Sequence, residues 1–395
     1  MLDRRSKVKK LRLKNPADRQ LSVLSFAGGG YLAVTSLKIL IEIEKVFLEI
    51  LLDRFGEFEF VETGRKSFPF HRLFDLLSGT STGSIVAMAL RSGLTPTQIL
   101  ELYLEHGQKI FPGTVSRFWN RFIVRGIFSG QGLSAPSLSS EPLLALLKAT
   151  LGETTIGEIN KNGRVMVIGI DCETDNTLHY KSWREEFQSL PAYLVVAGSC
   201  SADTYFSPTV IEQKEKTYYV SDGGTSGAND PILDAIVETF KFQEKEISVG
   251  GLEKLLSSLS GRRLSILETI RTLFGDSVLA ASIGTGERAT PREGKDMLDW
   301  GAAQLVTNGV LPSALLKRPE RHARKLASYL VDQNNFYSFN TPFMTAKETM
   351  DDASDSQVKS MLYDVDFWID QPATKSYINN FANRLVDLLE EVNHV

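Results

Sequence analysis

Gly79-Thr80-Ser81-Thr82-Gly83 stands between the apolar run Leu73–Leu77 and the run of small and apolar residues Ile85–Leu90. That order predicts a strand, a sharp turn and a helix. The two glycines carry no side chains, so a serine between them can hold its Oγ clear of the backbone. The serine also lies at a helix N-terminus, where the helix dipole favours negative charge. We therefore take Ser81 as a candidate nucleophile.

A second turn is built from Gly28, Gly29 and Gly30, which follow the apolar run Leu21–Phe26. A helical periodicity comes next and is expected to end near Gly56. Successive glycine N–H groups at the start of a helix can bind a phosphate or an oxyanion. The dinucleotide-binding pattern GxGxxG is not met, because an alanine occupies its third glycine position. An oxyanion hole is the favoured interpretation.

A third turn, Asp222-Gly223-Gly224, ends the short run Tyr218–Val220, which predicts a strand. A carboxylate in that place can reach a serine at a neighbouring strand end and accept its proton. Asp-Gly pairs also commonly form Asx-type turns with no chemical role. Taken alone, Asp222 favours that simpler interpretation; together with the other two turns it is the candidate general base.

The chain outside these turns alternates between short apolar runs and amphipathic stretches. Arg164–Ile170 and Val278–Ser282 predict strands, and Ser140–Leu151 and Asp230–Lys241 predict helices. Such alternation is typical of an α/β fold with a largely parallel central sheet. Beyond about residue 310 the pattern is mainly helical, including Ile378–Val392.

Composition suggests the outline of the domain organisation, and the boundary at residue 355 is implied by the extent of the family resemblance described below. Residues 1–20 hold a basic N-terminal arm, and residues 21–355 form the main domain. Residues 245–275 are charged and contain Gly and Ser, which predicts an insertion in that domain. Residues 356–395 are expected to form a helical extension packed on the same domain.

Bulk composition excludes several classes of protein. The chain has 395 residues, 42% of them hydrophobic, which is enough for a sizeable core, and a net charge of -4, which argues against a nucleic-acid polymer as partner. The two cysteines form no CxxC pair, and no His/Cys cluster has metal-ligand spacing, so no metal is expected. The sequence contains no run of 18 apolar residues, so no transmembrane helix is predicted.

The three turns, in this order, resemble the patatin-like phospholipase family, which has a Gly-rich loop, a GTSTG turn and a DGG or DGA turn. The resemblance covers about residues 20–355 and extends to four further elements: Thr204-Tyr205-Phe206, Ala228-Asn229-Asp230-Pro231, Ser282–Gly286 and Met350–Ala353. It implies a three-layer α/β/α fold and hydrolysis of fatty-acyl esters of membrane phospholipids by a Ser81–Asp222 dyad, without a cofactor.

The sequence departs from the family at the glycine loop. Leu32 and Ala33 occupy the places where the family usually has Arg or Lys and then Gly. A backbone oxyanion hole tolerates that change, since its donors are N–H groups. If a missing loop cation limits turnover, Leu32→Arg is expected to raise the rate on anionic phospholipid.

The chain also resembles bacterial patatin-like effectors of antiphage signalling, which implies activation by a cyclic nucleotide. An intracellular phospholipase needs a device that holds its basal activity down. We expect either the 245–275 insertion to act as a lid, or the helical tail beyond residue 310 to bind a regulator or a second copy of the chain. The expected location is cytoplasmic, peripheral to the inner membrane when active.

The sequence alone leaves two alternatives to the Ser81–Asp222 dyad open. An α/β-hydrolase triad places its histidine last in the chain, which leaves His322 and His394. His322 lies in the charged stretch Pro319–Arg324, which predicts a solvent-facing helix. The second alternative is a catalytically weak, lipid-binding pseudoenzyme, suggested by Leu32.

Overall fold

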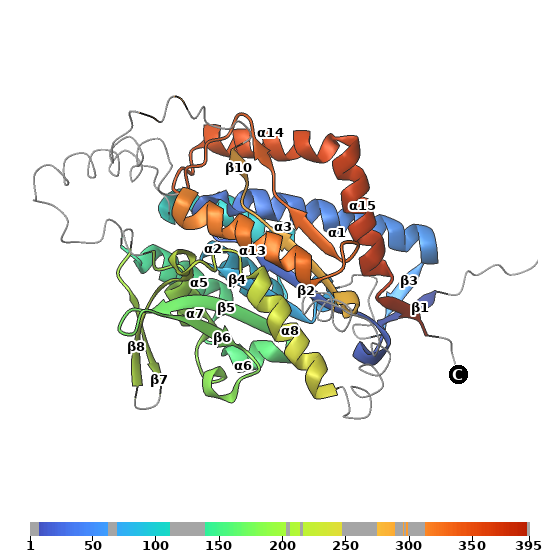
Figure 1. The fold of residues 1–395 in the computed structure, drawn as a ribbon, viewed down its shortest axis with the longest axis horizontal. Helices are drawn as coiled ribbons and strands as arrows, with labels where there is room; N and C mark the ends of the chain where they lie inside the picture. Colours follow the sequence, from blue (N-terminus) through green and yellow to red (C-terminus); the bar gives the residue numbers. More distant parts are fainter. Residues whose placement is uncertain are drawn as a thin grey trace, which may run out of the picture.

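The computed structural model describes residues 8–61, 69–110, 139–202, 206–213, 216–246, 275–288 and 313–392, together with Lys295 and Leu298. Nearly all of the insertion predicted over 245–275 lies outside these residues. An eight-stranded sheet forms the centre of the described part, and helices cover both of its faces (Figure 1).

Five strands of the sheet run parallel, in the order β11-β9-β2-β4-β5. Their bounds are Phe336–Phe339 for β11, Val278–Ile283 for β9, Leu21–Phe26 for β2, Leu76–Thr80 for β4 and Arg164–Asp171 for β5. Three antiparallel partners complete it: β6 (Asn176–Lys181), β7 (Thr209–Gln213) and β8 (Lys216–Asp222). The carboxyl ends of β2 and β4 therefore meet at one edge of the sheet, where the glycine turn and the GxSxG turn begin.

Strand β5 determines how the later strands approach the site. β6 pairs with residues 166–171 of β5 and β4 with residues 164–168, so β6 and β4 lie on opposite edges of β5. β8 pairs with residues 169–171 of β5, and β6 already pairs with the same residues along the other edge of that strand. β8 must therefore join β5 on the β4 edge, just beyond the end of β4.

Alternating side chains of the central strands face two separate cores, as expected for strands buried on both sides. Leu24, Phe26 and Leu77 point into the larger core, whereas Val23 and Leu76 point into the smaller one. The larger core is covered by α1 (Ala33–Phe55), α2 (Thr82–Arg91), α3 (Pro96–Ile110), α5 (Glu141–Leu151), α7 (Ala192–Ser199), α14 (Asp355–Asp370) and α15 (Pro372–Val386); the smaller core is covered by α8 (Ile232–Glu246) and α13 (Arg318–Leu330). The predicted three-layer α/β/α fold is thus confirmed.

A second sheet of three strands lies at the opposite end of the molecule from β7 and β8 (Figure 1). It joins β1 (Lys9–Leu13) to β3 (Phe58–Phe60) and to β13 (Leu389–Glu391). Part of the segment expected to be a basic arm is therefore a strand, and Lys9 and Arg12 form ion pairs with the acidic residues of β13.

Two boundaries differ from the sequence-based expectation. The helix predicted over Ile378–Val392 ends at Val386, because the next residues pair with β1, a partner more than 370 positions away. The strand predicted over Leu73–Leu77 is shifted toward the carboxyl end: Phe70–Leu73 is a 3-10 helix, and β4 continues through Gly79-Thr80 to the turn.

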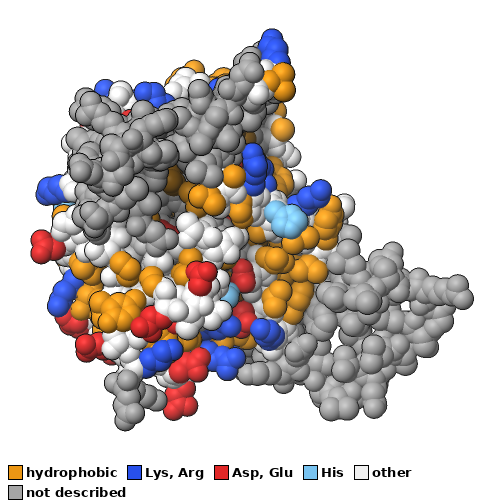
Figure 2. Space-filling view, turned by 60° about the vertical axis from the view of Figure 1, so that its left-hand side comes forward, with side chains coloured by type: hydrophobic (Ala, Val, Ile, Leu, Met, Phe, Trp, Pro, Cys, Tyr) orange, Lys and Arg blue, Asp and Glu red, His pale blue; other side chains and the backbone are white. Residues whose placement is uncertain are grey.

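No helix in the described ranges is long and apolar enough to cross a membrane. On the described surface that Figure 2 shows, acidic, basic and apolar side chains lie side by side, and no charge of one sign dominates that face.

Arg91 ties the carboxyl end of α2 to the sheet. Its side chain is fully buried, and its guanidinium donates to the main-chain oxygens of His71, Phe74, Asn162 and Arg164 at 2.9–3.1 Å. Burial lowers the pKa of Arg91 to about 9, so the group stays charged at neutral pH. One side chain thus holds together the beginnings of β4 and β5.

Arg91→Met should lower the free energy of unfolding by about 3 kcal/mol or more, because it leaves several buried carbonyl groups without a donor. Urea unfolding followed by circular dichroism measures the change. Lys109→Met, which removes an exposed cation of α3, is the control and should change stability by less than about 0.5 kcal/mol. Equal stability of both variants would show that the Arg91 bonds are dispensable.

Candidate active site

Ser81 occupies a strained turn between β4 and α2. Its φ of 53° and ψ of -132° lie outside the regions that side-chain-bearing residues normally adopt, and Asp175 is the other non-glycine residue with positive φ in the described ranges. Such a conformation costs about 1–3 kcal/mol and persists where the surroundings enforce it. Here Ser84 helps to enforce it, since its N–H and its hydroxyl both donate to the Ser81 carbonyl, at 2.8 and 2.6 Å.

The glycines of the turn allow three chain segments to pack closely. A Cβ on Gly79 would lie 2.2 Å from the Gly83 carbonyl oxygen, and a Cβ on Gly83 would lie 2.3 Å from the Phe26 oxygen. Both distances are far below van der Waals contact. Gly79 and Gly83 are therefore needed to bring the turn against the end of β2.

Asp222 reaches the same place through the β-sheet register. Thr80 pairs with Ile168 on β5, and Asp222 pairs with the next residue, Gly169, on the same edge. Ser199 strengthens this junction: its hydroxyl donates to the Ile168 carbonyl at 2.5 Å and accepts from the Ser81 N–H at 2.9 Å. Asp222 and Ser81 thus lie at the junction of β4, β5 and β8.

The Asp222 carboxylate is buried, with 7% of the residue exposed, and its Oδ1 accepts a hydrogen bond from the Gly224 N–H at 2.7 Å. This is the bond of an Asx-type turn, which the Asp-Gly pair alone predicted. It holds the carboxylate beside β4, the strand that leads to Ser81, so the Asx-type turn and the role as a base are compatible. Gly223 is required here, because a Cβ on it would lie 2.7 Å from the Ile168 oxygen. Burial, and then the charge of Asp222, raises the pKa of Cys200, which therefore stays a neutral thiol beside the site.

The glycine turn lies directly against the serine, since a Cβ on Gly28 would be 2.9 Å from Ser81 Cβ. The Gly28 N–H donates to the Asn229 carbonyl at 2.9 Å, and the Gly29 N–H makes a longer bond, 3.3 Å, to Thr82 Oγ1. Gly30 has a φ of 59°, and a Cβ there would meet the Met350 carbonyl at 2.2 Å. The N–H groups of Gly29 and Gly30 are therefore the better candidates for binding an oxyanion.

Asn229 is a site residue that sequence reasoning used as part of a resemblance but did not place in the site. Asn229 is 1% exposed. Its Oδ1 would lie only 2.4 Å from a Cβ on Gly28 and 2.8 Å from a Cβ on Gly224, so neither glycine could carry a side chain without moving it. Asn229 therefore joins the glycine turn to the aspartate turn.

Leu32 is a buried core residue rather than an exposed residue of the loop. Its side chain is 1% exposed and belongs to the larger core. The expectation that Leu32→Arg raises the rate on anionic phospholipid therefore has no structural basis.

Leu32→Arg should instead destabilise the protein by about 4 kcal/mol or more, because it buries a guanidinium without a partner. Thermal unfolding followed by circular dichroism measures this, with Leu32→Met as the control that keeps the volume and adds no charge. A folded Leu32→Arg variant with a raised rate on anionic lipid would restore the original expectation.

The two histidines of the alternative triad give it no support among the described residues. His322 is exposed on α13, as predicted, whereas its neighbours Ala323 and Arg324 are buried. His394 lies outside the described residues.

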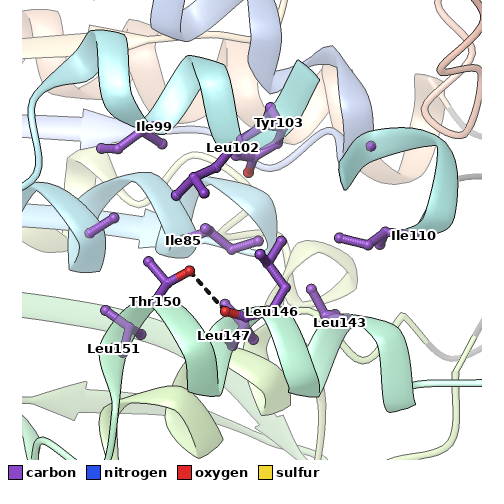
Figure 3. Close-up of a pocket in the computed structure, with 12 residues that line it drawn as sticks. Ile85, Ile99, Leu102, Tyr103, Ile110, Leu143, Leu146, Leu147, Thr150 and Leu151 are labelled. Carbon is purple, nitrogen blue, oxygen red and sulfur yellow. Dashed lines mark hydrogen bonds between the residues drawn. The ribbon is translucent and has the colours of Figure 1, made fainter. Parts of the chain in front are cut away.

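An apolar crevice begins one helical turn beyond the serine, where α2, α3 and α5 meet (Figure 3). Ile85 and Ala89 of α2 follow Ser81 at spacings of four residues and so lie on one face of the helix. Its other walls are apolar residues of α3 and α5, among them Ile99, Leu102, Leu143 and Leu147. The crevice is apolar, but its volume of about 30 Å³ is far below the roughly 150 Å³ of a cavity that binds benzene, so it does not hold an acyl chain as it stands.

Comparison with known proteins identifies the class to which this fold and site belong. The model of the family "Patatin-like phospholipase" matches residues 24–236, which include all three turns. The chain therefore belongs to the patatin-like phospholipase family, whose members are lipid acyl hydrolases.

The relatives include two bacterial proteins named "cGAMP-activated phospholipase". The one from Escherichia coli (strain TW11681) is 26% identical over 349 residues, covering 87% of this chain and 86% of that protein. The one from Vibrio cholerae serotype O1 is 24% identical over 352 residues, covering 87% and 88%. Patatin-16 of Solanum tuberosum is 22% identical over 334 residues, covering 79% and 77%.

Proposed function

We propose that this chain hydrolyses fatty-acyl esters of membrane phospholipids, with Ser81 as nucleophile and Asp222 as general base. The observation that carries the proposal is the strained Ser81 turn, because a conformation that costs about 1–3 kcal/mol is retained where it serves function. The buried carboxylate of Asp222, set beside that turn by the sheet register, supplies the base.

In the proposed reaction Asp222 accepts the hydroxyl proton while Ser81 Oγ bonds to the ester carbonyl carbon. The N–H groups of Gly29 and Gly30 stabilise the resulting oxyanion. The bond between that carbon and the glycerol oxygen then breaks, the oxygen takes up the proton, and the acyl group stays on Ser81. Water attacks in turn, with Asp222 as base, and releases the fatty acid.

A fluorophosphonate probe tests the nucleophile directly. It should label the wild-type protein at one serine, and mass spectrometry of the digested protein should locate the adduct on Ser81. In parallel, the protein should release fatty acid from phospholipid liposomes. An unlabelled Ser81 in a folded protein that binds liposomes would instead favour a lipid-binding pseudoenzyme.

We further propose that a cyclic nucleotide switches the enzyme on. The support is the likeness, along most of both chains, to two proteins named cGAMP-activated phospholipases. A phospholipase that waits for such a signal would act from the cytoplasm on the inner membrane, as an antiphage effector does. Self-association would be one way to stabilise its active state.

A further inference from the structure

Four charged side chains are buried together on the α13 side of the glycine turn: Lys317, Glu320 and Arg324 from the region of α13, and Asp230 just before α8. They are 7%, 0%, 7% and 0% exposed. Lys317 Nζ lies 3.2 Å from a Glu320 oxygen, and Arg324 joins Glu320 to Asp230 at 3.4 Å from each. Burying such charges costs several kcal/mol each, so stability alone is a poor reason for this α13 cluster.

One chain of contacts leads from the cluster to the glycine turn through Thr285. Lys317 Nζ donates to Thr285 Oγ1 at 2.8 Å, and that hydroxyl donates to the Gly28 carbonyl at 3.4 Å. The packing is tight, since a Cβ on Gly29 would lie 2.3 Å from Thr285 Oγ1.

A second chain of contacts ends on the same atom. Asn229 Nδ2 donates to Glu320 Oε1 at 2.5 Å and to the Gly28 carbonyl oxygen at 3.1 Å. Glu320 therefore orients Asn229, just as Lys317 orients Thr285, and both direct a donor to the oxygen of Gly28.

The planar trans peptide explains why that oxygen matters. The Gly28 carbonyl and the Gly29 N–H belong to one peptide unit and point in opposite directions. Anchoring the carbonyl on the α13 side therefore turns the Gly29 N–H toward the other side, where it meets Thr82, the neighbour of Ser81.

We propose that the α13 cluster positions the oxyanion hole: Lys317 and Glu320, acting through Thr285 and Asn229, fix the peptide that aims the Gly29 N–H at the substrate. The inference rests on the proposed function and adds positioning residues about 240 positions beyond the nucleophile. No cluster side chain needs to touch the substrate.

The test is Thr285→Val, which keeps the shape of the side chain and removes the hydroxyl that links Lys317 to Gly28. On a soluble short-chain ester, kcat should fall by about 100-fold with KM little changed, because a donor made for the transition state is misaimed. Thr285→Ser should restore most of the rate. Arg321→Ala is the matched control, since it removes an exposed ion pair of α13 with Glu287 and should leave kcat unchanged.

Amide hydrogen exchange at residues 28–30, measured by mass spectrometry on the same variants, gives a readout that needs no turnover. Exchange should accelerate in Thr285→Val and stay unchanged in Arg321→Ala. A folded Thr285→Val protein with wild-type kcat and wild-type exchange would overturn the positioning role. Altered exchange in a protein whose wild type hydrolyses no ester, either alone or with cGAMP and the other cyclic nucleotides, would instead overturn the proposed function. If Thr285→Val does not fold, Lys317→Met is measured in its place.

Discussion

Ser81→Ala should remove essentially all release of fatty acid from phospholipid, a loss of at least about 10⁴-fold, while the protein keeps its fold. The variant lacks the oxygen that forms the acyl-enzyme, and its methyl group fits the space of the hydroxymethyl group. Fatty-acid release from liposomes measures the loss, and circular dichroism checks the fold.

Asp222→Asn should cause a loss of similar size, roughly 10⁴-fold, since the amide keeps the shape of the carboxylate but cannot accept the serine proton. The bond from the Gly224 N–H can persist, so the turn should stay intact. Residues that act as one unit are not additive, and the double variant should be little worse than either single one.

His322→Ala is the matched control for both variants and should keep the wild-type rate, because that side chain is exposed on α13. An active Asp222→Asn protein together with an inactive His322→Ala protein would show that a Ser-His-Asp triad operates in place of the dyad.

The second large effect expected is activation by a cyclic nucleotide. In a two-state description, raising the active population from about 1% to 99% increases the rate about 100-fold and requires roughly 5.5 kcal/mol of differential affinity. The ligand must bind the active state better than the inactive one by that amount, or share the task with self-association.

A panel of cyclic di- and trinucleotides that includes cGAMP, added to the purified protein on liposomes, tests this expectation. Ser81→Ala with cGAMP is the control for contaminating lipase, and size-exclusion chromatography with and without ligand reports self-association. Full lipid hydrolysis without any nucleotide, unaffected by the whole panel, would contradict the proposed activation.

The local parts of the fold were predictable because they are encoded over short distances. The strand before Gly28 and the helix ending at Gly56 follow from apolar periodicity and a helix-terminating glycine, and the structure has them as β2 and α1. The GxSxG pattern likewise predicted a strand, a turn and a helix around Ser81, because only glycines permit so close an approach.

The non-local parts could not be predicted from the sequence. The stretch Pro319–Arg324 was expected to face solvent, yet Glu320 and Arg324 are buried, since their spacing of four residues puts them on one face of α13, against Asp230. Nothing near them in sequence identifies that partner. The pairing of β1 with Leu389–Glu391 was missed for the same reason.

The order in which the central sheet is completed affects the enzyme during its own synthesis. A nascent chain that has been translated as far as Gly224 already contains Ser81 and Asp222, but the strand that carries the glycine turn, β2, still lacks its neighbour β9 (Val278–Ile283). β11, which flanks β9, ends only at Phe339, 115 residues after Gly224. At about 10 residues per second the ribosome needs roughly 12 seconds more to supply them. Over that interval β2 has an open edge and α13 is not yet in place, so we expect the unfinished polypeptide to be inactive even though it already contains both Ser81 and Asp222.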